Sequence, residues 1–163
     1  MTNVFLISDT HFGHANIIKY AERPFNTVEE MNEVMVENWN SVVKQGDKVY
    51  HLGDVTMNSK SLDILSRLNG RKVLIKGNHD IQKLKFYTPH FYDIRGSHEL
   101  DNFVLTHIPV SDTQKLRYKG NIHGHTHEKN LQDPWYFNVS VEQINYTPIA
   151  FDEIVRKKTI EQL

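Results

Sequence analysis

Short apolar runs along the chain predict a series of buried strands. The runs from Val4 to Ser8, Lys48 to Leu52 and Arg71 to Lys76 are rich in β-branched and aliphatic residues, and each leads into polar residues. Continuous apolar runs of this length are typical of parallel strands that are covered on both faces. We therefore expect three parallel strands, each of which ends at a polar loop.

Helical patterns occupy the segments between these strands. Thr27 is followed three residues later by Glu30, as in a capping box, and an apolar face then continues until Gly46. The spacing predicts a helix over about 28–44, and three leucines closed by Asn69-Gly70 predict a shorter helix. Strand, helix, strand, helix, strand in this order implies parallel pairing through right-handed crossovers. In such sheets, functional residues gather outside the carboxyl ends of the strands.

The second half of the chain reads as β-rich, after a short helix near 81–87. No linker or repeat divides the sequence, so we expect a single domain over 1–163. Phe151, Ile154 and Val155 suggest a terminal helix. We predict an α/β fold with two mixed β-sheets packed as a sandwich, flanked by helices. The strand candidates of this half are Tyr92 to Arg95, His98 to Leu100, Asn102 to Thr106, Asn121 to His123 and Tyr136 to Val141.

Composition narrows the classes of partner and compartment. The net charge is −1 and the sequence pI is about 6.8, so no cationic field attracts long duplex nucleic acid, and we expect none as a partner. Cysteine is absent, which excludes disulfides and thiolate metal sites. The N-terminal run Val4 to Ile7 is too short for a signal peptide or a membrane span. We therefore expect a cytoplasmic protein with no membrane partner.

Polar residues suited to metal binding follow the predicted strands. A single block could be an ordinary capped loop, but several blocks at strand ends of one small domain predict a shared site. Carboxylate, amide and imidazole groups suit Mn²⁺ first, with Fe, Zn²⁺ or Ni²⁺ as alternatives. Two divalent metal ions with a water between them cleave phosphoesters. The blocks are Asp9-Thr10-His11, Gly53-Asp54, Gly77-Asn78-His79-Asp80, Thr106-His107 and Gly124-His125-Thr126-His127.

These five blocks, in this order, resemble the pattern of the calcineurin-like metallophosphoesterase superfamily. The opening segment from Ser8 to Ile18 is similar to a compact branch of that superfamily found in bacteria and phages. The resemblance implies that the metals lie at the C-terminal ends of the strands, that Asp54 bridges them and that His79 is not a ligand. It assigns Asp9, His11 and His127 to one metal and Asn78, His107 and His125 to the other.

For such a centre we expect a hydroxide between the two metals to attack phosphorus, and His79, held by Asp80, to act as general acid. The resemblance to the compact branch also suggests that His14 and Asn16 contact the substrate. Arg23 could bind phosphate oxygens through its guanidinium, although an arginine before a proline is equally an ordinary surface residue. His51, His90, His98 and His123 stand outside the motifs and are expected to be structural.

The spacing between the blocks leaves no room for a cap domain, so we expect an open site. The leading hypothesis is hydrolysis of a small phosphoester, a phosphodiester such as a cyclic or short nucleotide. A phosphomonoesterase acting on nucleotides or phosphoproteins uses the same residues. A nuclease shares the chemistry but lacks the basic surface that long duplexes require. A non-catalytic metal-binding scaffold is the alternative outside the enzyme class.

Overall fold

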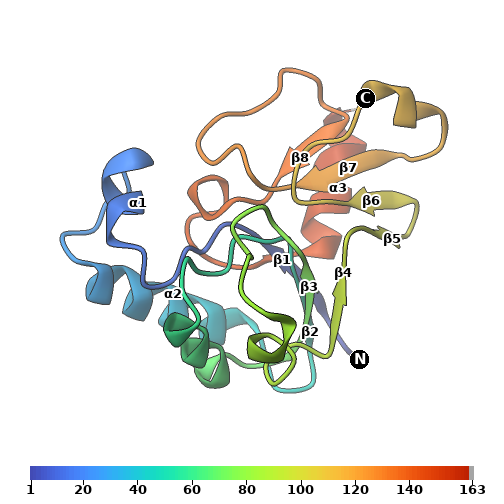
Figure 1. Ribbon diagram of the computed structural model, residues 1–163. Helices are drawn as coiled ribbons and strands as arrows, with labels where there is room; N and C mark the ends of the chain where they lie inside the picture. The colour runs from blue at the N-terminus through green and yellow to red at the C-terminus, as the bar shows by residue number, and fades with distance from the viewer. Residues whose placement is uncertain (162–163) are drawn as a thin grey trace.

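The computed structural model describes residues 1–161, which form two β-sheets (Figure 1). The first sheet has five strands in the order β4-β3-β2-β1-β9. Its first four strands are parallel, and β9 runs antiparallel to β1. The predicted parallel pairing of the first three strands is confirmed. The strands of this sheet are β1 (Val4–Ile7), β2 (Lys48–His51), β3 (Arg71–Ile75), β4 (Asp93–Arg95) and β9 (Ile149–Ala150).

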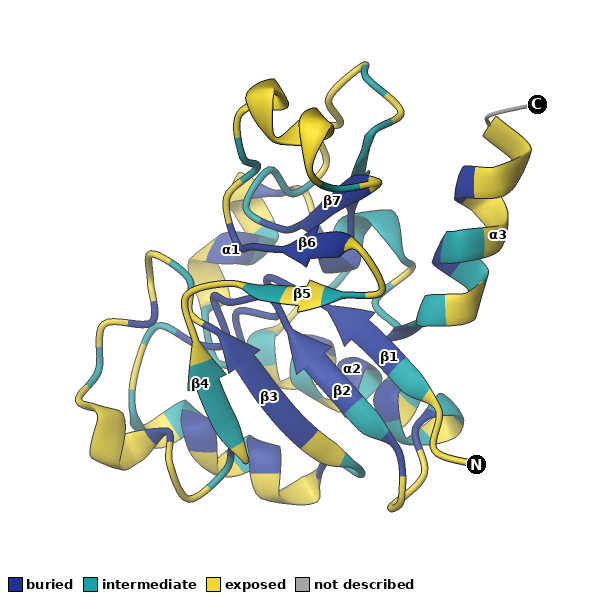
Figure 2. Cartoon of the chain, turned by 90° about the vertical axis from the view of Figure 1, so that its right-hand side faces the viewer, coloured by how far each residue is buried: buried dark blue, intermediate teal, exposed yellow. Residues whose placement is uncertain are grey.

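The second sheet has four strands in the order β5-β6-β7-β8. Its strand β5 is antiparallel to β6, and the other pairs are parallel. Figure 2 shows that the carboxyl ends of β1, β2 and β3 point toward this sheet. Both sheets are mixed and flanked by helices, which confirms the predicted fold class. The strands are β5 (His98–Leu100), β6 (Phe103–Leu105), β7 (Gly120–His123) and β8 (Tyr136–Asn138).

Helices cover the outer faces of this arrangement. The longest helix is capped as predicted, because Thr27 Oγ1 accepts a hydrogen bond from the backbone of Glu30 at 3.1 Å. Within residues 1–161, no helix combines the length and apolar character needed to cross a bilayer. The α-helices are α1 (Ala15–Tyr20), α2 (Val28–Val42) and α3 (Phe151–Glu161); the 3₁₀ helices are η1 (Lys60–Arg67), η2 (Leu84–Phe86), η3 (Asp112–Leu116) and η4 (Val141–Gln143).

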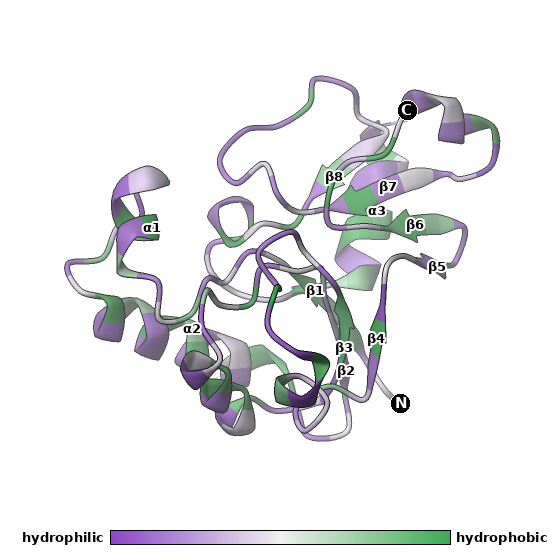
Figure 3. Ribbon diagram, in the orientation of Figure 1, coloured by the Kyte–Doolittle hydropathy of each residue, from purple (hydrophilic) through white to green (hydrophobic). Residues whose placement is uncertain are grey.

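Two hydrophobic cores lie on opposite faces of the first sheet. Successive residues of a strand point to opposite faces, so Ile7 joins one core and Leu6 joins the other. The first core includes Met35 and Trp39 of α2, and the second includes Leu105 of the second sheet. Figure 3 shows hydrophobic colour along β3 and β6, which contribute to the second core. Packing on both sides therefore fixes the strand ends in place.

The structure differs from the sequence prediction in several elements. The short helix predicted near 81–87 is the three-residue 3₁₀ helix η2, and neither η3 nor η4 was predicted. The strand predicted over Tyr136 to Val141 ends at Asn138, where the Asn138 side chain accepts a hydrogen bond from Ser140 N at 2.9 Å and turns the chain into η4. The two-residue strand β9 was not predicted, because two residues carry no periodic signal. The helix of three leucines is a 3₁₀ helix, η1.

The end of β1 joins the two sheets. Ser8 N donates to Val139 O at 2.9 Å, and Val141 N donates to Ser8 O at 3.1 Å, which makes an isolated bridge between Ser8 and Ser140. β1 also lies between β2 and β9 in its own sheet. The polar loop that starts at Asp9 is therefore held by backbone hydrogen bonds on both sides.

Candidate metal centre

All seven side chains predicted as metal ligands lie in loops that follow strands of the two sheets. Asp9 and His11 follow β1, and the other ligands follow β2, β3, β6 and β7. Parallel strands bring their carboxyl ends to one edge of a sheet, so these loops meet. In each of two groups, the carboxylate and imidazole atoms lie within 4.8 Å of one another. One group is Asp9, His11 and His127, and the other is Asp54, His107 and His125.

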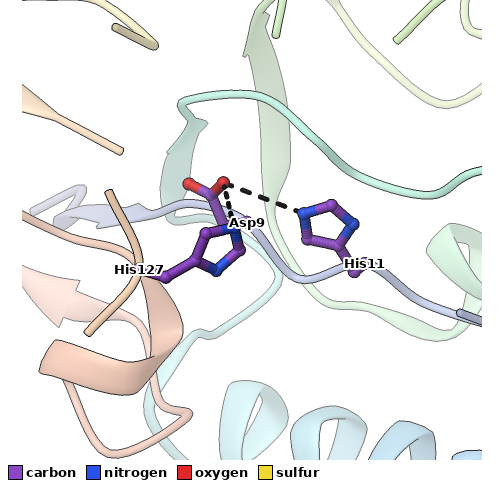
Figure 4. Close-up of side chains that lie close together, drawn as sticks. All are labelled: Asp9, His11 and His127. Carbon is purple, nitrogen blue, oxygen red and sulfur yellow. Dashed lines mark ion pairs between the residues drawn. The ribbon is translucent and has the colours of Figure 1, made fainter. Parts of the chain in front are cut away.

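The first group presents unsatisfied atoms to a common point (Figure 4). Asp9 Oδ1 lies 3.5 Å from His127 Nε2 and 3.8 Å from His11 Nε2. Both Asp9 Oδ1 and His11 Nε2 are buried without a hydrogen-bond partner. Buried polar atoms of this kind are rare in folded proteins because they cost free energy. A divalent cation bound among the three side chains would satisfy them.

In the second group, several lone pairs face one another. His107 Nδ1 donates a hydrogen bond to Leu52 O at 2.7 Å, so the proton of the neutral ring lies on Nδ1. His107 Nε2 then faces Asn78 Oδ1 at 2.9 Å, His125 Nδ1 at 3.2 Å and Asp54 Oδ2 at 3.4 Å. His125 Nδ1 is also 3.1 Å from Asn78 Oδ1. Acceptors that converge in this way suit a bound cation, and Asn78 joins the group as a neutral oxygen donor.

Asp54 lies between the two groups. Its Oδ2 is 3.6 Å from His11 Nε2 and 3.4 Å from His107 Nε2, so one oxygen reaches a histidine of each group. Its Oδ1 accepts a hydrogen bond from the backbone of His79 at 2.9 Å, which fixes the orientation of the carboxylate. This is the geometry that a carboxylate needs to bridge two neighbouring cations.

The backbone at the candidate ligands is held in an unusual conformation. Five of them, Asp9, His11, Asp54, His125 and His127, have φ between 48° and 70°. Such left-handed conformations cost non-glycine residues about 1–3 kcal/mol each and cluster at functional sites. The loops therefore adopt a backbone conformation of higher local energy, which points these side chains toward one another.

Two glycines let the loops approach closely enough. Gly53 has φ +102°, and a Cβ there would lie 2.5 Å from the backbone nitrogen of Gly77. A Cβ on Gly124 would collide with Ser8 Oγ and Asp9 Oδ2. Any larger residue at either position would push apart the strand ends that carry the ligands.

The electrostatics of the site keep its carboxylates ionised. Burial raises the pKa of Asp54, but the hydrogen bond and charge of His107 outweigh it and hold the pKa below its ordinary value. The pKa of Asp9 is likewise held low, although burial opposes this, by His11, His107 and His127. Burial lowers the pKa of His107, but Asp54 and Asp9 raise it to about 9. A proton and a metal ion would therefore compete for His107 Nε2.

His79 lies beside the two groups but belongs to neither. Its side chain is exposed, and its ring centroid is 5.8 Å from that of His11. Asp80, predicted to hold the His79 ring, has a different role. Its buried carboxylate accepts hydrogen bonds from the backbone nitrogens of Gly77, Asp54 and Val55 at 2.8–3.0 Å. Asp80 thus connects the loop after β3 to the loop after β2 by hydrogen bonds. These bonds hold Asn78 and Asp54 close to each other.

The prediction that Arg23 contacts phosphate is wrong. The Arg23 side chain is 0% exposed. One terminal nitrogen, Nη2, donates to Asp9 O at 2.6 Å, and the other, Nη1, donates to Thr10 O at 2.9 Å. Arg23 therefore supports the Asp9 loop from behind. The sequence indicated a guanidinium close to the first motif but could not show which side of the loop it occupies.

Glu142 is a residue of the site that the sequence analysis missed. Its Oε1 accepts hydrogen bonds from Arg23 Nη2 and from His127 Nδ1, each at 2.8 Å. With Nδ1 committed to a carboxylate, His127 presents Nε2 toward Asp9. No motif contains Glu142, and the only signal was an acidic residue between the apolar residues Val141 and Ile144.

His14 lies against a candidate ligand. Its Nδ1 is 3.4 Å from His11 Nδ1, so the two rings share a hydrogen bond that leaves His11 Nε2 free. Burial, with His11 as the next cause, lowers the pKa of His14, which favours the neutral ring as the acceptor. Asn16 is exposed in the first turn of α1. Contact of either residue with a substrate stays a prediction.

Comparison with known proteins agrees with this arrangement. A family model described as the calcineurin-like phosphoesterase superfamily domain matches residues 2–139. An uncharacterized protein of Methanocaldococcus jannaschii is 43% identical, with 96% of this chain and 91% of that protein covered. The Gene 66 protein of Mycobacterium phage L5 is 31% identical, with 77% of this chain and 60% of that protein covered.

A solved structure is also similar along nearly the whole chain. The crystal structure of a protein of unknown function from Aquifex aeolicus aligns with a TM-score of 0.80 and 28% identity, covering 96% of this chain and 100% of that chain. Relatives from an archaeon and a mycobacterial phage are compatible with a compact branch of the family. On the family match and the agreement of its motifs with the observed geometry, this chain belongs to the calcineurin-like phosphoesterase superfamily.

Proposed function

We propose that this metal-dependent phosphoesterase hydrolyses phosphodiesters, with cyclic and short nucleotides as the substrate class. The observation that carries the proposal is the position of Asp54, whose Oδ2 lies within 3.6 Å of a histidine of each candidate metal group. Two divalent cations held by the two groups would lower the pKa of water and would neutralise charge on a transferring phosphoryl group.

In this proposal the ligand sets follow the two groups. Asp9, His11 and His127 hold one metal, and Asn78, His107 and His125 hold the other. The mixed oxygen and imidazole donors favour Mn²⁺, with Fe, Zn²⁺ or Ni²⁺ as alternatives. The unpartnered Asp9 Oδ1 and His11 Nε2 support the first set, and the facing lone pairs around His107 Nε2 support the second.

The leaving group is protonated by His79 in this proposal. The exposed imidazole lies beside His11, where it can reach an oxygen that departs from phosphorus. Its main chain is fixed by the hydrogen bond to Asp54 Oδ1. A ring proton of His79 passes to the leaving oxygen, which prevents the build-up of an alkoxide charge.

Two cavities that border the centre support a diester as substrate. One, of about 510 Å³, touches His125 and His127, and the other, of about 350 Å³, touches Asn78 and His107. A phosphodiester carries two organic groups and can place one in each cavity. Lys76 in the second cavity favours a phosphomonoester as the alternative, because a monoester dianion carries an extra charge that a lysine would balance.

A substrate panel tests this proposal. Bis-p-nitrophenyl phosphate, p-nitrophenyl phosphate, and 2′,3′- and 3′,5′-cyclic nucleotides would be assayed with Mn²⁺, Ni²⁺ and Zn²⁺. We expect the diesters to give kcat/KM at least about tenfold above the monoester. Faster monoester turnover would favour the phosphatase alternative. Absence of hydrolysis by protein that holds two metals would favour a metal-binding scaffold.

Asp54→Asn provides the matched variant for the same assay. It keeps the size of the side chain but removes the negative charge between the two metal groups, so we expect a loss of about 10³-fold or more in kcat. Asp63→Asn is the control, because Asp63 is exposed on η1. Full turnover by Asp54→Asn would contradict the bridging role.

A further inference from the structure

We propose that the cavity between α1 and the segment 125–131 binds an aromatic ring of the phosphoester substrate. This inference rests on the proposed function, because it places the phosphate at the metal centre. The cavity has a volume of about 510 Å³, and Ile17, Tyr20 and Ala21 of the α1 region face the segment from His125 to Leu131 across it. A volume of this size is typical of sites for small organic ligands.

Four of the residues that line the cavity form an apolar patch: Ile17, Tyr20, Ala21 and Leu131. Ile17 and Ala21 are buried, whereas Tyr20 is 76% exposed and Leu131 is 44% exposed. A single exposed apolar side chain is normal on a protein surface, but here two large ones line the same cavity. A planar ring between them would remove apolar surface from water, and the Tyr20 ring offers a face or an edge for stacking.

The cavity borders the candidate metal centre. His125 and His127 line it, and each belongs to a different ligand group. A phosphate that contacts both groups therefore lies beside the cavity. An aromatic group attached to that phosphate through one or a few bonds can enter the cavity without a long linker.

The charges of the lining favour an uncharged ring over a second phosphate. Glu128 and Lys129 are adjacent, exposed and opposite in charge, so together they add no net positive charge to the cavity. The cavity that touches Asn78 and His107 contains Lys76 instead. The two cavities thus differ in chemistry, and the one lined by Tyr20 and Leu131 suits a nucleobase or an aryl group.

The wall formed by α1 is held in place by the core. Ile17 is 6% exposed and belongs to the hydrophobic core that includes residues of α2, and Ala21 N donates to Ile17 O at 2.9 Å. Arg23 N donates to Ile18 O at 2.9 Å, so the end of α1 is fixed just before the Arg23 side chain passes behind the Asp9 loop. A wall anchored in this way loses little entropy when a ring binds against it.

Phosphonates test the proposal without requiring turnover. Phenylphosphonate and methylphosphonate share the metal-binding group and differ in the ring, and their carbon–phosphorus bonds are not hydrolysed by a phosphoesterase. Binding of each to protein loaded with Mn²⁺ would be measured by isothermal titration calorimetry. We expect phenylphosphonate to bind about tenfold more tightly than methylphosphonate, because the ring buries apolar surface of the cavity.

Two exposed positions allow variants that leave the core intact. In the Tyr20→Ser, Leu131→Ser double variant we expect the ratio of the two affinities to fall toward one. Tyr92→Ser is the matched control, because Tyr92 is 68% exposed and is not among the residues of the cavity. We expect this control to keep the ratio.

Two results would overturn the ring-binding site while leaving the proposed function in place: equal affinities in the unmodified protein, or an unchanged ratio in the double variant. Failure of both phosphonates to bind protein that holds two metals would instead remove the proposed phosphate site, and the ring site with it. Leu131→Ser alone provides the same comparison if the double variant does not fold.

Discussion

The hydrogen bonds of individual histidines determine which nitrogen can bind a metal. His107 commits Nδ1 to Leu52 O, and His127 commits Nδ1 to Glu142, so each ring offers Nε2 to the centre. In His51, by contrast, neither ring nitrogen is free to bind a metal. Its Nε2 is hydrogen-bonded to the hydroxyl of Thr10, and its Nδ1 accepts a hydrogen bond from Gly53 N. Burial lowers the pKa of His51 to about 3, so it stays neutral and structural, as predicted.

Glu142 is expected to act on metal affinity through His127. Glu142→Gln keeps the shape of the side chain but removes the negative charge of the group that accepts a hydrogen bond from His127 Nδ1. Loss of such a supporting carboxylate weakens metal binding by about 10–100-fold. Competition with a chelator would measure the affinity, and Glu37→Gln on the exposed side of α2 is the control. Equal metal affinities of the Glu142→Gln and Glu37→Gln variants would show that metal binding by His127 does not depend on the charge of Glu142.

His79 is expected to affect catalysis and not metal content. His79→Gln should lower kcat by about 10²–10⁴-fold, because the leaving oxygen loses its proton donor. The loss should be smaller for a p-nitrophenyl ester than for a cyclic nucleotide, since p-nitrophenolate leaves readily without a proton. Elemental analysis should still find two metals per chain. The disappearance of one metal equivalent would make His79 a ligand.

At the scale of elements, the local pattern of apolar and polar residues was sufficient to predict the buried strands and the helices between them. The apolar runs correctly predicted β1, β2 and β3, and the Thr27 cap predicted the start of α2. Because a strand end fixes where the next loop begins, all seven predicted ligands were brought together. Local pattern failed where partners are distant in sequence. Asp80 binds the backbone of Asp54 and Val55, and β9 exists only through its pairing with β1.

Lys72 is expected to destabilise β3 at neutral pH. It is 8% exposed, its Nζ donates to Gly70 O at 3.1 Å, and burial lowers its pKa from 10.5 to about 8. The charged form is therefore disfavoured by folding. The loss of folding free energy caused by burying this charge is complete below pH 8. It disappears as the pH rises toward 10.5, the pKa of lysine in the unfolded chain.

Lys72→Met should accordingly raise the free energy of unfolding at pH 7 by about 2 kcal/mol. This advantage over the unmodified protein should shrink between pH 8 and pH 10.5. Urea unfolding between pH 7 and pH 10.5 measures the difference in the free energy of unfolding. Lys60→Met is the control, because Lys60 is an exposed residue of η1. A difference that does not depend on pH would show that packing, and not charge, is responsible.

At the scale of the whole molecule, the candidate centre joins the two sheets. Asp9, Asp54 and Asn78 come from the first sheet, and His107 and His125 come from the second. The hydrogen-bonded backbone bridge between Ser8 and Ser140 makes a second connection between the same two sheets. Cations bound there would add a link between the two sheets, which also meet through the second hydrophobic core.

Metal addition should therefore stabilise the entire fold. A ligand present at 100 times its Kd adds about 2.7 kcal/mol when only the folded state binds it. For a domain of this size that corresponds to a rise in Tm of about 5–10 °C. Differential scanning calorimetry with Mn²⁺, and again after addition of a chelator, measures the effect. The shift should be smaller in Asp54→Ala; an equal shift would locate the stabilising ions elsewhere.

The pairing of β1 with β9 has a consequence for synthesis on the ribosome. β1 and the loop with Asp9 and His11 leave the exit tunnel long before Ile149 and Ala150, which follow more than a hundred residues later. Until then β1 has one neighbour, and its other edge is open to pairing with foreign chains. A polypeptide stopped before Ile149 should thus be prone to aggregate, because this edge of β1 stays without its partner strand.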